Sequence, residues 1–113
     1  MPSPSELARG NIVGNWVLAV MLSPASVAAN TTAEQTFAVT GLAMGDFCEI
    51  IKPTTQGGLG IVNSRVSAAG VLAIAFANVT GTAITPTASE VYSLLVSRPV
   101  NVASNVATLT SIN

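Results

Sequence analysis

Short apolar segments separated by turn residues fill the stretch from Thr36 to Ser97. The apolar segments TFAVT, FCEII, IVNSRV, VLAIAFA and EVYSLLVS alternate with GLAMGD, PTTQGGLG, SAAG and NVTGTAITPTAS. Segments of about four to eight residues that are rich in β-branched and aromatic side chains, and are bounded by Gly, Pro, Asn or Ser, are typical of strands. The sequence therefore predicts an all-β protein.

The length of 113 residues fits a single domain that buries its own core. We predict a single antiparallel β-sandwich, jelly-roll-like, over residues 12–113, with six firm strands. A weaker final strand is predicted where Val106, Thr108, Thr110 and Ile112 alternate. Residues 1–11 contain two prolines and end in Gly10-Asn11, so we assign them to an arm outside the core.

Alternating apolar positions predict which side chains form the core. Glycines at both ends of residues 41–46 favour a hairpin between residues 36–40 and 47–52. Glu49 shares a strand face with apolar residues and needs a cation unless it lies near an edge, and Arg65 is the candidate. The predicted core residues are Phe37, Val39, Ile50, Val62, Val66, Leu72, Ile74, Phe76, Leu94 and Val96.

Two predicted strands have apolar residues on a face that does not belong to that core. The run from Trp16 to Leu22 is apolar on both faces, so we expect it to be covered twice. The strand over residues 71–77 has a flat, uncharged second face, the alanine ladder, which either a neighbouring loop or another subunit must cover. This ladder consists of Val71, Ala73, Ala75 and Ala77.

Low charge favours self-association. Charged residues make up 8% of the chain, against about 25% in a typical soluble domain, and the net charge is −1. A largely neutral surface gives weak repulsion between copies, so we expect a homodimer or homotrimer, with a low-charge monomer as the alternative. The four basic residues are scattered, which argues against nucleic-acid binding. The longest unbroken apolar run is too short to cross a bilayer.

The residues that chemistry needs are scarce. The chain has no histidine and one cysteine, Cys48, so neither a Ser-His-acid triad nor a zinc site can be assembled in the usual way. Asp46 and Glu49 are three residues apart on a strand, which places them on opposite faces. We therefore predict no enzymatic activity, no metal and no cofactor.

The N-terminal part imitates a secretion signal. Residues 12–22 are apolar, and the following SPASVAA contains small residues spaced like a cleavage site. A secretion signal begins with a basic segment, however, whereas here Arg9 is offset by Glu6. Gly14 and Asn15 also interrupt the apolar segment. We expect this segment to be a strand of the domain and not a signal; a secreted or periplasmic domain would require the signal.

A block from about residue 24 to residue 99 resembles small virion proteins of tailed bacteriophages. The resemblance lies in TFxVxGLxxGD, in GLGIVxxRVSAAxxLxIxFxNxTG and in ITPTAxExY, as these patterns stand in TFAVTGLAMGD, GLGIVNSRVSAAGVLAIAFANVTG and ITPTASEVY. Proteins of this pattern look like capsid decoration or cement proteins, which are β-sandwich modules. Similar modules also occur in fibres. The matching residues are fold residues, so no functional residue is transferred from them.

The resemblance implies a structural protein on the outer capsid surface of the virion, made in the host cytoplasm, whose partners are the major capsid protein and further copies of itself. The alternative is a head- or tail-fibre module that binds a host receptor or glycan, which would need exposed aromatic platforms. The arm has too little apolar surface to offset the ~1–2 kcal/mol per residue that fixing a backbone costs, so we expect a partner to order it. The predicted interface residues are Glu6, Arg9, Trp16, Val71, Ala73, Ala75 and Ala77.

Overall fold

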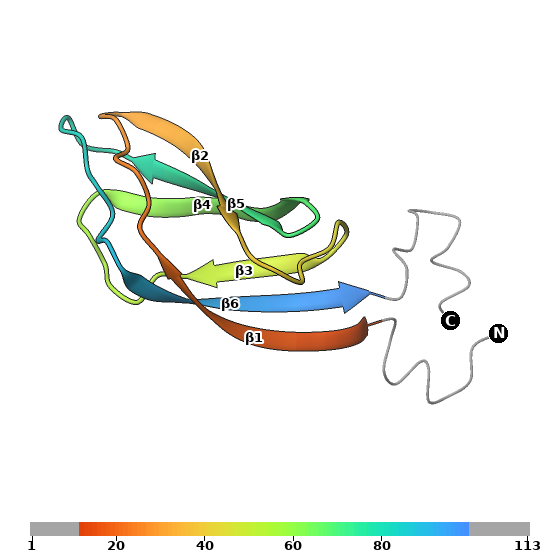
Figure 1. Cartoon of the computed structure of the whole chain (residues 1–113). Helices are drawn as coiled ribbons and strands as arrows, with labels where there is room; N and C mark the ends of the chain where they lie inside the picture. The colour runs from red at the N-terminus through yellow and green to blue at the C-terminus, as the bar shows by residue number, and fades with distance from the viewer. Residues whose placement is uncertain (1–11, 100–113) are drawn as a thin grey trace, which may run out of the picture.

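The computed structural model describes residues 12–99 and shows an all-β sandwich, which confirms the predicted fold class (Figure 1). No helix occurs in this range. A jelly roll has eight strands, whereas six lie in the described range. The strands are β1 (Ile12–Leu22), β2 (Thr31–Ala38), β3 (Phe47–Ile51), β4 (Leu59–Ala68), β5 (Val71–Asn78) and β6 (Glu90–Pro99).

Two three-stranded antiparallel sheets make the two layers of the sandwich. The β6 sheet has the order β1-β6-β3, and the β5 sheet has the order β2-β5-β4. The chain changes sheet at every connection except the one between β4 and β5. β1 begins and β6 ends at the same end of the sandwich, where Ile12 pairs with Pro99 (Figure 1).

The predicted hairpin at residues 41–46 is wrong, because β2 and β3 belong to different sheets. Gly41 and Gly45 do adopt positive φ angles of 100° and 92°, so the turn signal was real. Between them, Leu42 is buried and its carbonyl accepts a 2.8 Å hydrogen bond from the Gly70 backbone N–H. The segment therefore crosses from one sheet to the other, with Leu42 anchored in the core.

The core lies between the two sheets, and it confirms most of the predicted residues. Phe76, Leu72, Ile74 and Leu94 are fully buried, and Phe37 is half-buried against them. Several further core residues were not predicted: Leu22, Val27 and Leu42 come from a strand end and from connections, and Ala73 and Tyr92 lie within β5 and β6. The buried core residues are Leu22, Val27, Val39, Leu42, Ile50, Val66, Leu72, Ala73, Ile74, Phe76, Tyr92, Leu94 and Val96.

Val62 is the predicted core residue that the structure contradicts, since 61% of its surface is exposed. The pairing of β4 with β5 shifts between Ile61 and Asn63, so a β-bulge inserts one extra residue there. The bulge reverses the inside-outside alternation that precedes it. Ile61 consequently packs against the core in place of Val62.

Asn78 hydrogen-bonds two connections at the end of the sandwich opposite the Ile12–Pro99 pair. Its side chain is 1% exposed and donates hydrogen bonds to the carbonyls of Val27 at 3.1 Å and Thr82 at 2.8 Å. Val27 also forms an isolated β-bridge with Ile84. These bonds close this end of the sandwich with the chain's own backbone.

Candidate functional site

The outward side of the β6 sheet is apolar. Register places Val17 beside Leu95 and Ala19 beside Ser93, and paired residues point to the same face. Tyr92, Leu94 and Val96 of the same strand are buried, so their neighbours at alternate positions point outward. We name this surface the outer apolar face; its apolar members are Val17, Ala19, Met21, Phe47, Ile51, Val91 and Leu95.

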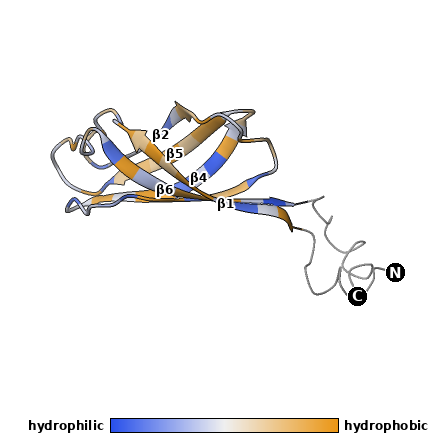
Figure 2. Cartoon of the chain, turned by 60° about the horizontal axis from the view of Figure 1, so that its bottom comes forward, coloured by the Kyte–Doolittle hydropathy of each residue, from blue (hydrophilic) through white to orange (hydrophobic). Residues whose placement is uncertain are grey.

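These side chains are open to solvent in the described part of the chain. Val17 is 73% exposed, Met21 65% and Phe47 57%. Figure 2 shows the hydrophobic colour on parts of this sheet, which is seen there nearly edge-on. The register from Asn15 to Met21 covers seven residues, and at the usual ~3.3 Å per residue and ~4.8 Å per strand a three-stranded face of that length projects to roughly 330 Å². The largest apolar patch on a typical monomer measures about 300–600 Å² and is often functional, so this face is a candidate interaction surface.

Glu49 is the one charged residue of this face, where it pairs with Leu95 in the β3–β6 register. The predicted partner of Glu49 is wrong, because Arg65 lies on the other sheet and bonds Glu34. The polar members of the face are Asn15, Ser93 and Ser97, and the Ser97 hydroxyl donates a 2.6 Å hydrogen bond to Asn15. The face therefore combines apolar side chains with a single carboxylate.

The outward side of the β5 sheet is built differently. Arg65 pairs in register with Ala73, and Glu34 pairs with Ala75, so these two charged residues flank β5 from opposite strands on one face. The Arg65 Nε and Nη2 groups donate to the Glu34 carboxylate at 2.9 and 2.8 Å. This ion pair must pass over the alanine ladder, and Ala73 is fully buried beneath it.

The rest of the alanine ladder, Val71, Ala75 and Ala77, is half-buried. The covering that the sequence analysis required is thus partly supplied by side chains of flanking strands. The Arg65 hydrogen bonds hold the pKa of Glu34 below its usual value, so the ion pair persists at neutral pH. Contact of the ladder with another subunit stays a prediction.

A second ion pair lies where the two sheets meet near the start of β1. Arg98 Nε and Nη2 each donate to the Asp46 carboxylate at 2.8 Å, and Nη2 also donates to the Gly41 carbonyl at 2.8 Å. The guanidinium lies 4.9 Å from the centre of the Trp16 ring, within cation–π range. The Asp46 side chain is 2% exposed, and the Arg98 hydrogen bonds lower its pKa.

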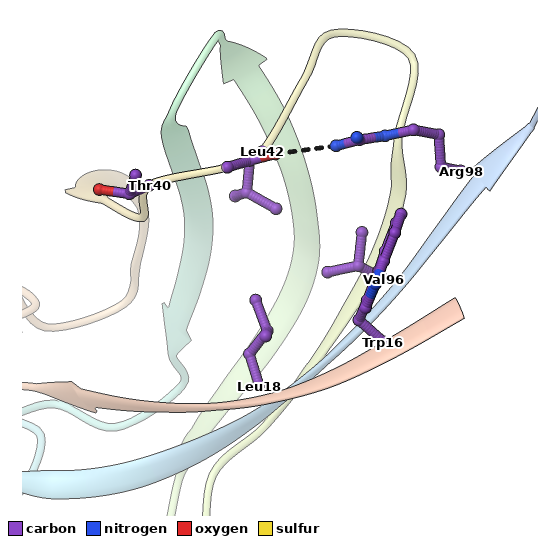
Figure 3. A pocket seen from close by; sticks show the side chains of 7 residues that line it. Trp16, Leu18, Thr40, Leu42, Val96 and Arg98 are labelled. Carbon is purple, nitrogen blue, oxygen red and sulfur yellow. Dashed lines mark hydrogen bonds between the residues drawn. The ribbon is translucent and has the colours of Figure 1, made fainter. Parts of the chain in front are cut away.

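A cavity of about 190 Å³ opens beside this ion pair (Figure 3). Trp16 and Leu18 of β1 line one side, and the turn at residues 40–42 lines the other; Val96 and Arg98 of β6 complete the lining. Pockets for small-molecule ligands usually hold ~300–1,000 Å³. This cavity suits a single apolar side chain better than a substrate or cofactor.

Across residues 12–99, no three His, Cys, Asp or Glu side chains gather in a group that could hold a metal ion. Cys48 is half-buried, and burial raises the pKa of its thiol, so it stays protonated near neutral pH and is a poor nucleophile. That the protein is not an enzyme stays a prediction. In the same range, no helix has the length and hydropathy of a membrane span.

Of the predicted interface residues, Trp16 is 43% exposed at the rim of the cavity, and the alanine ladder lies on the opposite sheet. Glu6 and Arg9 lie outside the described residues, as do the arm and the predicted final strand at residues 106–112. The Asp46–Arg98 pair was not predicted, because its partners are 52 positions apart and no local pattern joins them.

Comparison with known proteins adds no relative: no family model, no curated protein and no solved structure matches the chain.

Proposed function

We propose that this protein is a structural virion protein that binds the outer surface of a bacteriophage capsid and stabilises it, as decoration or cement proteins do. The observation that supports it most is the outer apolar face, since a shell protein needs an extended contact surface and no catalytic group. The sequence resemblance over residues 24–99 supplies the class of partner. The major capsid protein is the surface to which this face docks.

The size of the outer apolar face fits attachment in many copies. A stable one-to-one complex buries ~800 Å² on each partner, and the face projects to roughly 330 Å². One contact of this area is weak. A protein present in many copies on a shell, held also by other contacts, gains avidity from weak contacts that act together.

Glu49 sets the chemistry of the docking surface on the shell. A carboxylate that leaves water for an apolar contact is costly unless a cation meets it. The capsid surface should therefore carry a lysine or arginine surrounded by apolar residues, placed so that it meets Glu49. This charge pair would fix the orientation of the sandwich on the shell.

A fibre module that binds a receptor or glycan is the weaker candidate. Such a module needs an accessible aromatic platform, and the partly exposed Trp16 is the aromatic ring next to the cavity. Arg98 already lies over that ring, however, and is held there by Asp46 and Gly41.

The test uses phage shells that lack this protein. We expect the purified full chain to sediment with the shells and to raise the temperature at which they break. Glu49→Lys should weaken binding, because it replaces the carboxylate with a second cation. Thr32→Lys is the matched control, since Thr32 is an exposed strand residue on the outward side of the β5 sheet. Failure of the wild-type chain to bind shells would overturn the proposal.

The arm gives an independent prediction within this proposal. Deletion of residues 1–11 should weaken shell binding and leave the unfolding temperature of the free protein nearly unchanged, because we assign those residues to attachment. A destabilised fold with unchanged shell affinity would instead make the arm a part of the domain.

A further inference from the structure

One edge of β1 is open. β1 pairs with β6 along one side, and no strand within residues 12–99 pairs with its other side. Its 11 residues, IVGNWVLAVML, include no charged residue and no proline. Proteins usually protect such edges with charges, prolines or bulges, and β1 has only a register shift between Ile12 and Gly14.

The other three edge strands, β2, β3 and β4, also pair on one side only, but each carries a charged residue, Glu34, Glu49 or Arg65, and meets a side chain from another part of the chain. Between β3 and β4, the Ser64 hydroxyl donates a 3.1 Å hydrogen bond to the Cys48 carbonyl. Beside β2, the Gln35 side-chain amide bonds both the N–H and the carbonyl of Ala25, at 2.7 and 2.8 Å. The edge of β1 near Trp16 and Leu18 has no equivalent contact within the described range, and the cavity opens there.

We propose that a second copy of this protein pairs antiparallel with the free edge of β1, about a two-fold axis. The two β6 sheets then form one six-stranded sheet with the order β3-β6-β1-β1-β6-β3. Two identical strands related by a two-fold axis normal to the sheet are necessarily antiparallel. Any charge on such a strand would lie near its own copy, and β1 carries none.

The inward-pointing side chains of β1 also favour a second copy of β1 as the partner. Trp16 is 43% exposed, and Leu18 and Val20 are half-buried, although all three point toward the core. A strand added to this edge continues the inward row with its own Trp16, Leu18 and Val20. One of these side chains can enter the cavity between β1 and the turn at residues 40–42. Strand addition commonly works this way, because backbone bonds supply affinity and pockets accept alternate side chains.

Stacking of two outer apolar faces is the competing arrangement for a second copy. It would bury two Glu49 carboxylates, and none of the residues of that face is a lysine or arginine. Edge pairing leaves Glu49 in water and extends the outer apolar face across both copies, to roughly 660 Å². The inference does not rest on the proposed function, because it concerns the free protein.

Two double variants on one face separate these arrangements. Val17→Lys with Ala19→Lys places charges on the edge strand, and Ser93→Lys with Leu95→Lys places them at the paired positions of the central strand. All four positions are exposed, so both variants should keep the fold. In sedimentation at equal concentration, we expect a dimer for the wild type, a monomer for the edge variant and a dimer for the central variant. A wild-type monomer or trimer, or dissociation by the central variant as well, would overturn edge pairing.

Hydrogen exchange provides the second measurement. In the dimer, alternate β1 amides that point away from β6 should be protected, and the edge variant should lose that protection while its circular dichroism stays that of a β-protein. A monomeric wild type whose β1 amides are all protected would show that another segment of its own chain covers the edge, which also contradicts the proposal.

Discussion

Both sheets of this sandwich bury an apolar inner face, but their outer faces differ in how far the chain covers them. On the β5 sheet, small side chains lie under an ion pair that spans three strands, and Ala73 is completely shielded. On the β6 sheet, large apolar side chains such as Val17 and Met21 are exposed around one carboxylate. The first face is covered by its own chain, and the second is open to solvent in the described part of the chain.

This difference shows that an apolar strand face is not by itself an interface. The alanine ladder on β5 and the outward residues of β6 are both uncharged when these central strands are considered alone. Only the flanking strands distinguish them, because Arg65 and Glu34 reach over β5 whereas β1 and β3 add further apolar residues beside β6. The small size of alanine is then a requirement for the ion pair to cross the strand.

The largest expected effect is on stability, in a comparison of Phe76 in the core with Phe47 on the outer apolar face. Phe76→Ala should lower the free energy of unfolding by about 3–5 kcal/mol, because it leaves a cavity in the core. Phe47→Ala should change it by less than about 0.5 kcal/mol, because Phe47 is 57% exposed. Urea denaturation measures both. Equal losses would mean that Phe47 is packed in the free protein.

The next comparison uses two alanines on the two outer faces. Ala73→Leu should cost about 1–3 kcal/mol of stability, since the larger side chain must displace the ion pair above it. Ala19→Leu should stay within about 0.5 kcal/mol, because Ala19 is exposed. A tolerated leucine at position 73 would show that the ion pair does not seal the face.

The smallest effect concerns acid. Hydrogen bonds from Arg98 hold the pKa of Asp46 below its ordinary value of 3.8, so the pair stabilises the protein above that pH and the contribution is lost as the pH falls through the lowered pKa. Asp46→Asn should therefore be less stable than the wild type at pH 7, and the gap should begin to narrow below about pH 4 and close once the pH is below the lowered pKa. Glu34 and Glu90 are present in both proteins, so thermal melts of the pair isolate Asp46. A gap that is independent of pH would contradict the ion pair.

Most strands could be predicted because alternation is a local signal, but β2 begins at Thr31, five residues before the segment predicted at residues 36–40. Leu72, Ile74 and Phe76 alternate with small residues over one continuous segment, and the structure buries all three. The turn at residues 41–46 was also visible, but a turn signal does not say whether the next strand joins the same sheet. Nothing in the sequence around Val62 marks the bulge that exposes it.

The candidate site was only partly predictable, because its defining contacts are long-range. Arg65 and Glu34 are 31 positions apart, and Arg98 and Asp46 are 52 apart. The two-faced character of the strand from Trp16 to Leu22 was visible in the sequence alone. That its second face joins β6 and β3 in one exposed surface depends on strand order, which local patterns do not contain.

Oxidative footprinting of two methionines tests most directly whether the outer apolar face is the docking surface. Met21 lies on that face and Met44 lies in the crossover between the sheets, and both are 65% exposed. A solvent-accessible methionine is readily oxidised to the sulfoxide. When the protein is bound to shells, Met21 should be protected relative to the free protein, while Met44 stays reactive. Continued oxidation of Met21 on the shell, with or without protection of Met44, would contradict the account.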